Sequence, residues 1–181
     1  MSDALKLTAY FPERERSGSR FLAESMLELF AQRQVATSVL LRGITGFGRR
    51  HIINTDQSLT LSEDPSVVVA AVDDADTIRG LAGEVAAMTP AGLITLERAQ
   101  LLRDDGTTTL PDAVKLTVCV GRNRRAGGMP AYKAVCDLLH RHRFTGASVL
   151  LGVDGTVQGE RQRAHFIARN VDVPMMIIAV G

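Results

Sequence analysis

The strongest cluster of potentially functional residues is a short segment rich in glycine and arginine. Glycine tolerates positive φ angles and close approach to the backbone, so successive N–H groups can converge on an anion. Arginine adds a permanent charge and paired donors that suit phosphate. The segment is therefore a candidate site for a small anionic ligand, although the residues by themselves favour the alternative of a flexible hairpin loop with a solvated basic tip. Its members are Arg42, Gly43, Gly46, Phe47, Gly48, Arg49 and Arg50.

Other chemistry has weak support in the sequence. The segment lacks the Gly-Lys-Ser/Thr of a classical phosphate loop, and the next predicted element is a strand. His140 and His142 are two residues apart on a predicted helix and so point to different faces. Cys119 and Cys136 occupy predicted core positions, where a free cysteine usually fills space. No Ser or Cys lies in an elbow motif. We expect neither an enzyme nor a metal site.

Composition sets the broad class of the protein. The 181 residues are 45% apolar and 23% charged, with a net charge of +1 and 4% aromatic residues. These values are typical of a globular domain, and they do not favour a nucleic-acid partner. The longest apolar stretches, Val67 to Val72 and Met175 to Val180, are far shorter than the roughly 20 residues of a membrane span. With only two cysteines, we expect a cytoplasmic protein.

The sequence contains an internal repeat. Leu5 to Thr8 recurs at 114–117, and Ser38 to Leu41 recurs at 148–151. The Gly-x-x-Gly of the basic segment recurs as Gly152 and Gly155, and the stretch after Pro65 recurs after Pro174. All four matches fall in the same order at an offset of 109 or 110, so we predict a complete module over 1–103, a linker over 104–112 and a second module over 113–181.

Hydrophobic periodicity predicts the elements of the first module. The strands are expected at 5–10, 38–42, 59–72 with a break at Pro65, and 93–103. Ser17-Gly18-Ser19 is expected to cap a first helix, and Asp74 a second helix over 75–88. The order β-α-β-β-α-β predicts an α+β, ferredoxin-like fold.

The second module is predicted to stop after its third strand, without the last helix and strand. Strands are expected at 114–120, 148–151 and 175–180, with Pro130 at the first position of a helix. The edge of the 114–120 strand would then be left unpaired, so either another strand fills this edge or the natural protein continues beyond this chain. The candidate anion-binding residues of this module are Gly152, Gly155, Arg161 and Arg163.

The combined motifs resemble a known family. Leu40-Leu41-Arg42-Gly43-Ile44-Thr45-Gly46-Phe47-Gly48, Leu61-Ser62-Glu63-Asp64-Pro65 and Gly92-Leu93-Ile94-Thr95-Leu96-Glu97 are similar to the PII-like domain of unknown function 190, also called uncharacterised protein family 0166. The resemblance covers the first module and, more weakly, the second. It implies ferredoxin-like trimers that bind adenine nucleotides in clefts between subunits, and a loop between strands two and three that contacts a partner, often a membrane transporter or channel.

The resemblance also assigns residues. Gly46-Phe47-Gly48-Arg49 stands where PII proteins begin this loop with Gly-Phe-Gly-Arg, and Gly92, Arg98 and Arg103 match or lie near further ligand-binding positions. Leu93 stands where PII proteins have a lysine, which implies a ligand with fewer phosphates or another anion. Two alternatives remain: an oligomerisation or protein-interaction module without a small ligand, and RNA binding suggested by the Gly43-x-x-Gly46 spacing.

Overall fold

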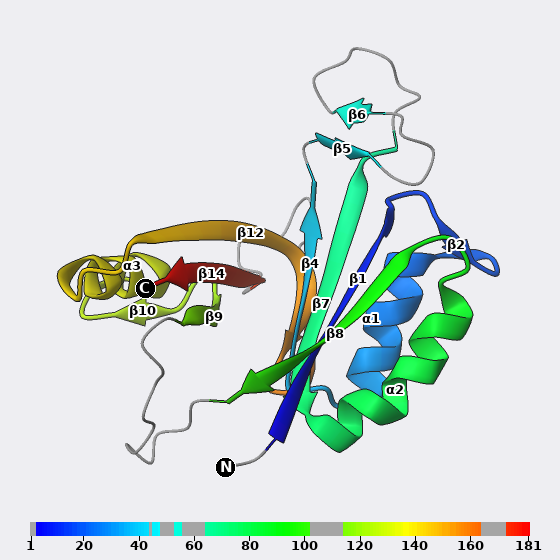
Figure 1. Ribbon diagram of the computed structural model, residues 1–181, viewed down its shortest axis with the longest axis horizontal. Helices are drawn as coiled ribbons and strands as arrows, with labels where there is room; N and C mark the ends of the chain where they lie inside the picture. Colours follow the sequence, from blue (N-terminus) through cyan, green and yellow to red (C-terminus); the bar gives the residue numbers. More distant parts are fainter. Residues whose placement is uncertain (1–2, 44, 48–52, 56–63, 102–113, 164–172) are drawn as a thin grey trace.

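The structure is a computed structural model that describes residues 3–43, 45–47, 53–55, 64–101, 114–163 and 173–181. It is a mixed α+β protein whose described residues form one large curled antiparallel sheet, three two-stranded sheets and three helices (Figure 1). The main strands of the first repeat lie in the sheet order β8-β1-β7-β4, and those of the second in the order β12-β14-β9. None of the described helices is long and apolar enough to cross a bilayer.

The elements of the first repeat follow the predicted order. They are β1 (Asp3–Pro12), β2 (Arg16–Ser17), β3 (Arg20–Phe21), α1 (Leu22–Gln32), β4 (Thr37–Arg42), β5 (Thr45–Phe47), β6 (Ile53–Thr55), β7 (Ser66–Asp74), α2 (Ala75–Met88) and β8 (Leu93–Gln100). The predicted strand at 59–72 is β7 from Ser66 onward, and its part before residue 64 lies outside the described residues.

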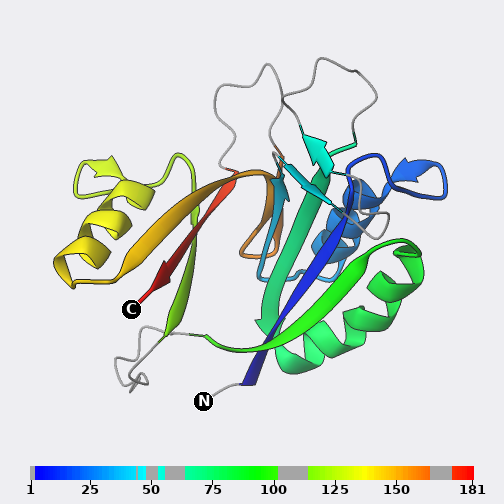
Figure 2. The same cartoon turned by 45° about the horizontal axis from the view of Figure 1, so that its top comes forward.

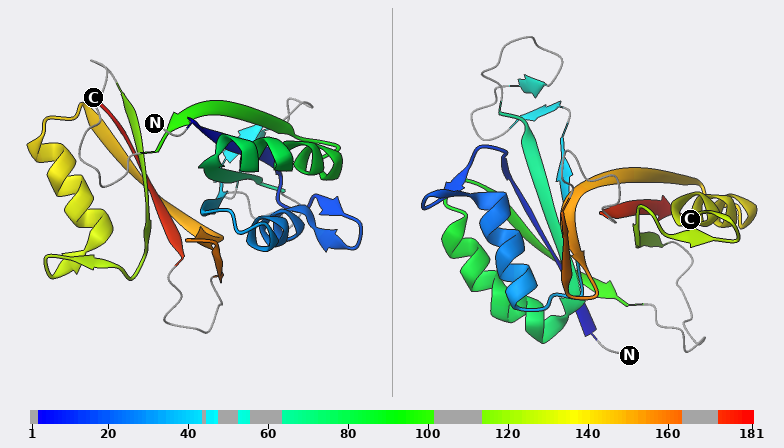
Figure 3. Two further views of the ribbon diagram at one scale, coloured as in Figure 1. Left: turned by 90° about the horizontal axis from the view of Figure 1, so that it is seen from below. Right: turned by 180° about the vertical axis from the view of Figure 1, so that it is seen from behind.

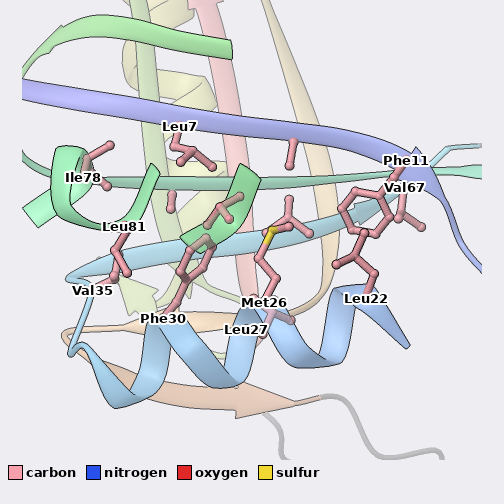
Figure 4. Close-up of a cluster of buried hydrophobic side chains, with 14 residues drawn as sticks. Leu7, Phe11, Leu22, Met26, Leu27, Phe30, Val35, Val67, Ile78 and Leu81 are labelled. Atoms are coloured by element: carbon pink, nitrogen blue, oxygen red, sulfur yellow. The ribbon is translucent and has the colours of Figure 1, made fainter. Parts of the chain in front are cut away.

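Helices α1 and α2 bury one face of this part of the sheet (Figure 4). Alternate residues of β1 and β7 point toward the helices, as the period of two requires. Leu7, Val69 and Phe30 are fully buried in this cluster. Burial of each such side chain stabilises the fold by roughly 1.5–3 kcal/mol, so this cluster is the main core of the protein.

Local sequence signals determine where α2 begins, but they do not determine where α1 begins. Asp74 accepts hydrogen bonds from the N–H groups of Asp76 (3.1 Å) and Thr77 (3.0 Å), which confirms the predicted cap. The predicted Ser17-Gly18-Ser19 cap is wrong, because these residues form the turn between β2 and β3, with Gly18 at a φ of +64°. Helix α1 begins at Leu22, whose N–H donates to the carbonyl oxygen of Glu15 at 2.8 Å across this hairpin.

The second repeat has fewer elements. They are β9 (Lys115–Gly121), β10 (Arg125–Ala126), β11 (Met129–Pro130), α3 (Ala131–Arg141), β12 (Gly146–Val157), β13 (Glu160–Arg163) and β14 (Pro174–Val180). Pro130 precedes α3 as its N-cap and is not the first helical residue. Among the described residues β9 pairs only with β14.

The elements of the second repeat correspond in order to elements of the first. Residues 22–32 of α1 correspond to 131–141 of α3, an offset of 109. The turns after both helices carry the same positive φ, at Gln34 and Arg143. The third strands correspond at an offset of 108. The N–H of Glu13 donates to the carbonyl oxygen of Pro65, and the N–H of Arg122 donates to that of Val173, both at 2.9 Å, so Pro65 corresponds to Val173. The sequence match gives an offset of 110 at Ser38 and of 109 at Pro65. The structural offsets are 109 and 108, so each sequence offset is one residue too large.

The repeats join through β4 and β12 into one sheet, which bends along β12 (Figures 2 and 3). The helix-free faces of the two parts turn toward each other, and Met176 packs against Val39 and Ala70 between them. Helix α3 covers the opposite, outer face of β14 and β9 (Figure 3). At one corner the terminal strands meet, where Glu97 of β8 lies 3.4 Å from the ammonium group of Lys115 in β9.

Candidate functional site

A cavity of about 390 Å³ lies where the repeats meet. Its volume lies at the lower end of the range of small-molecule sites, and it is widely open to solvent rather than enclosed. One wall comes from the connection after β1 and from α1, another from β4, and a third from the β12–β13 hairpin of the second repeat. The lining residues are Glu13, Arg14, Phe21, Ala23, Glu24, Leu27, Leu40, Asp154 and Arg161.

The predicted basic segment begins at the rim of this cavity. Arg42 ends β4, and its guanidinium donates to the carboxylate of Glu13 at 3.0 Å. Both side chains are about half exposed, at 53% and 40%. The next residue, Gly43, donates its N–H to the carbonyl oxygen of Ser66 at 2.8 Å, which fixes the start of the connection to β7.

The opposite wall is a part-buried ion pair from the second repeat. Arg161 bonds both carboxylate oxygens of Asp154, at 3.3 and 2.8 Å, and reaches Glu28 of α1 at 3.2 Å. Burial by itself would lower the pKa of Arg161, but its hydrogen bond to Asp154 and the nearby carboxylates outweigh burial and raise the pKa. Arg161 is therefore a permanent positive charge that ties the second repeat to α1.

The rest of the basic segment and the other predicted residues of the first repeat are dispersed. Gly46 and Phe47 lie in β5, whereas Gly48, Arg49, Arg50 and Arg103 lie outside the described residues. Gly92 lies at the same end of the sheet as Gly43, but the strand order β8-β1-β7-β4 separates them by three strand spacings, about 14 Å. Arg98 is exposed near the other end of β8, opposite Leu5. Of these predicted residues, Arg161 lines the cavity and Arg42 contacts the lining residue Glu13, whereas Gly43, Gly92 and Arg98 are not part of the lining.

The glycines of the second repeat have a packing role. A Cβ atom on Gly152 would lie 2.1 Å from the carbonyl oxygen of Pro174, and one on Gly155 would lie 2.2 Å from that of Ser38. Glycine is required at both positions because two backbone segments approach there. Arg163 follows in β13, opposite Asp154.

Sequence reasoning missed much of the cavity lining. Glu13, Arg14 and Phe21 belong to the β1–α1 connection, where no motif marked them. Phe21 is 45% exposed, and the guanidinium of Arg16 lies 4.8 Å from its ring centre. Asp154 could have been noticed because it occupies the place of Thr45 in the repeat, so a carboxylate there is specific to the second copy. The described residues contain no cluster of three potential metal ligands.

Cys119 is the most strongly perturbed thiol. Burial raises the pKa of its thiol to about 11, and the ammonium group of Lys6 offsets part of this rise. In a Cys136→Ala variant at pH 8, we expect Cys119 to react with a disulfide reagent on the order of 100-fold more slowly when folded than in urea, because the thiolate is the reactive form. Stopped-flow absorbance measures both rates, and rates within tenfold of each other would contradict a buried thiol.

Comparison with known families decides the classification. The model of the family DUF190, described as an uncharacterized ACR, matches residues 4–101 and 113–181. The chain belongs to the DUF190 family. The two matched segments coincide with the two structural repeats, so the cavity of this DUF190 protein lies between two family-matched segments of one chain.

Proposed function

We propose that this DUF190 protein is a PII-like regulatory protein that binds a small anionic ligand, with an adenine nucleotide as the first candidate. The observation that carries the proposal is the position of the cavity. Its lining residue Glu13 pairs with Arg42, the last residue of β4 before the connection to β7. A ligand there contacts the start of the segment that is proposed to bind the regulated partner.

The strand arrangement supports a PII-like module. The first repeat has the order β-α-β-β-α-β and the sheet order β8-β1-β7-β4, which is the split βαβ arrangement of ferredoxin-like folds. The second repeat has the matching strands β12, β14 and β9 without counterparts of α2 and β8 in the described residues. We therefore interpret the chain as tandem ferredoxin-like modules.

Arg161 in the cavity lining and Arg42, which contacts the lining through Glu13, differ in how easily they can accept an anion. The Arg42–Glu13 pair is half exposed, and such pairs contribute only about 0–1 kcal/mol. The Arg161–Asp154 pair is mostly buried, at 18% and 7% exposure, and is much harder to separate. A phosphate is therefore expected to replace Glu13 on Arg42 and to leave Arg161 in place.

The remaining lining suits the base of a nucleotide. Ala23, Leu27 and Leu40 give an apolar surface, and Phe21 offers an aromatic ring. Glu13 or Glu24 can accept a hydrogen bond from an exocyclic amino group. The proposed orientation places the base in the cavity and the phosphates toward Arg42, with Arg49 and Arg50 following in sequence.

In the proposed response, the ligand replaces Glu13 as the partner of Arg42, where the β4–β7 connection begins. A ligand shifts the connection between two arrangements only through different affinities for them. Release of Glu13 from Arg42 provides such a difference. The partner proposed for the connection is a membrane transporter or channel, and the proposed assembly is a trimer.

A protein-interaction module without a small ligand is the second candidate. The observation that favours it is an exposed apolar stretch in β12, where Val149, Leu150 and Leu151 are 38%, 36% and 50% exposed. Consecutive exposed apolar residues on a strand mark an interaction site.

Replacement of Arg42 by alanine tests the ligand site. We expect Arg42→Ala to weaken nucleotide binding at least tenfold, because a charge-assisted hydrogen bond to phosphate is lost. Isothermal titration calorimetry with AMP, ADP and ATP measures the effect. The control is Arg33→Ala, which removes an equally exposed pair with Glu84 away from the cavity. Wild-type protein that binds none of the three nucleotides would refute an adenine-nucleotide function, and unchanged affinity in Arg42→Ala would refute the site.

A further inference from the structure

In the first repeat, a hairpin of the second repeat covers the edge of β4 that faces away from β7. The end of β12 pairs with β4 and places Asp154 opposite Leu40. Both residues line the cavity, together with Glu13 and Glu24 from the first repeat. The covering strand therefore brings a carboxylate to a wall that is itself acidic, and Arg161 of the same hairpin forms an ion pair with that carboxylate.

The equivalent edge in the second repeat has no such cover. Residues 146–151 correspond to β4 at the offset of 109 that relates α1 to α3. Val149 takes the place of Leu40, because each pairs with the equivalent residue of its third strand. Among the described residues this segment pairs with β14 alone, and all six residues are exposed (Figure 2). An exposed strand edge without charged residues is a template for another strand.

The wall beside this uncovered edge carries the opposite charge. Arg122 takes the place of Glu13, as the matching backbone hydrogen bonds to the third strands show. Lys133 takes the place of Glu24 in the first turn of the helix. Both side chains are exposed, and neither forms an ion pair with a carboxylate in the described part of the chain. A strand that covers this edge as β12 covers β4 therefore meets two cations where the first repeat has two carboxylates.

We propose that this edge binds an extended acidic segment of a partner protein by strand addition. The segment pairs with residues 146–151 and places a carboxylate opposite Val149, the position equivalent to that of Asp154 in the first repeat. There the carboxylate lies beside α3 and pairs with Arg122 and Lys133. Main-chain hydrogen bonds along the edge supply affinity, and the carboxylate supplies selectivity.

The edge itself is apolar on the α3 side of the sheet. Val149 is opposite Ile177, which is fully buried in the cluster under α3, so Val149 and Leu151 lie on that side. They are 38% and 50% exposed. A strand that buries them gains apolar contact, whereas a basic strand would be repelled by Arg122 and Lys133. The recognised segment is therefore expected to have an acidic residue with an apolar residue two positions away.

The terminal strands of the large sheet in a second copy fit this site poorly. Strand β9 contains no acidic residue. The single carboxylate of β8, Glu97, already contacts the ammonium groups of Lys6 at 3.6 Å and Lys115 at 3.4 Å. A strand from a different protein is therefore the expected occupant. The proposal rests on the second candidate function, a protein-interaction module, and a failed nucleotide titration leaves it standing.

Peptide binding to the full chain tests the charge selectivity. The probe is a capped, fluorescently labelled peptide with the sequence of this protein's own covering strand, Leu151 to Gln158, which contains one aspartate. The matched peptide has lysine in place of that aspartate. We expect the wild type to bind the acidic peptide about tenfold more tightly than the lysine peptide, because two cations attract one and repel the other. Fluorescence anisotropy measures both affinities.

Two variants of α3 separate the site from general attraction. Lys133→Glu is expected to abolish the preference for the acidic peptide, because its new carboxylate cancels the charge of Arg122. Arg141→Glu makes the same charge change at an exposed position about 12 Å along the helix, and is expected to keep the preference. Equal affinity of the wild type for both peptides, no binding of either at millimolar concentration, or the same loss in both variants would overturn the proposal.

Hydrogen exchange measured by mass spectrometry locates the bound peptide. With the acidic peptide at saturation, we expect amides within 146–151 to exchange about fivefold more slowly, because strand addition gives the edge hydrogen-bond partners. Strands β8 and β9 serve as comparison strands and are expected to be unchanged. Protection of β8 or β9 in place of 146–151 would overturn the proposal. So would protection of 146–151 that rises with the concentration of the protein alone, because a second copy would then be the occupant.

Discussion

Replacement of Gly152 by alanine is expected to destabilise the protein strongly. The new Cβ would lie 2.1 Å from the carbonyl oxygen of Pro174 and 2.8 Å from a methyl group of Val39, so β12 must move away from both strands. Forced overpacking of this kind lowers the free energy of unfolding by about 1–3 kcal/mol, and the backbone contact favours the upper end. Urea unfolding followed by circular dichroism measures the change.

The matched control for this substitution lies in α2. Gly80 is exposed in the middle of the helix, and a Cβ there meets nothing within 4 Å. Gly80→Ala is expected to stabilise the protein by roughly 0.5–1 kcal/mol, because alanine loses less entropy in a helix. Equal stability of Gly152→Ala and the wild type would show that β12 does not cross β4 and β14 as closely as described.

Loss of Arg161 is expected to have the largest effect of any charged side chain at the junction. Arg161→Ala leaves Asp154, which is 5% exposed, without its guanidinium partner. Removal of one member of a fully buried ion pair costs about 3–5 kcal/mol, and because Arg161 is part-buried and Asp154 keeps the N–H of Gly155, we expect a loss near the lower end. The link from the β12–β13 hairpin to Glu28 is lost as well.

Two further variants separate the buried charge from general damage. Arg33→Ala removes an exposed pair with Glu84 and is expected to lower the free energy of unfolding by less than about 1 kcal/mol. The double variant Asp154→Asn with Arg161→Gln removes both buried charges and is expected to recover part of the loss. A single Arg161→Ala variant no less stable than Arg33→Ala would contradict the buried pair. Chemical denaturation of all three proteins provides the comparison.

Local sequence signals predicted the elements that local interactions stabilise. Helix α2 begins at Ala75 and ends at Met88 because Asp74 caps its first turn and Ile78, Leu81 and Val85 share one face. The repeat and the family resemblance were also visible in the sequence. The cap of α1 was missed because the N–H of Leu22 is satisfied by Glu15, across a hairpin that no periodic pattern reveals.

The cavity required the tertiary structure. Its walls come from residues more than 100 positions apart, and their meeting depends on the pairing of β4 with β12. The buried hydroxyl of Thr156 lies 2.9 Å from that of Ser38 and 3.0 Å from the carbonyl oxygen of Val35, which fixes this register. Neither contact follows from the propensity of any residue involved.

The sequence by itself determined the two repeats, the identity of most strands and helices, and the glycine–arginine segment after β4. Those features depend on periodicity, caps and residue type, which act over a few neighbouring residues. Only the tertiary structure decided that β12 extends to Val157, that Gly152 and Gly155 carry it onto β4, and that Arg161 closes the cavity. These features depend on which strand edges remain open once the repeats fold, and an open edge is a property of the whole sheet.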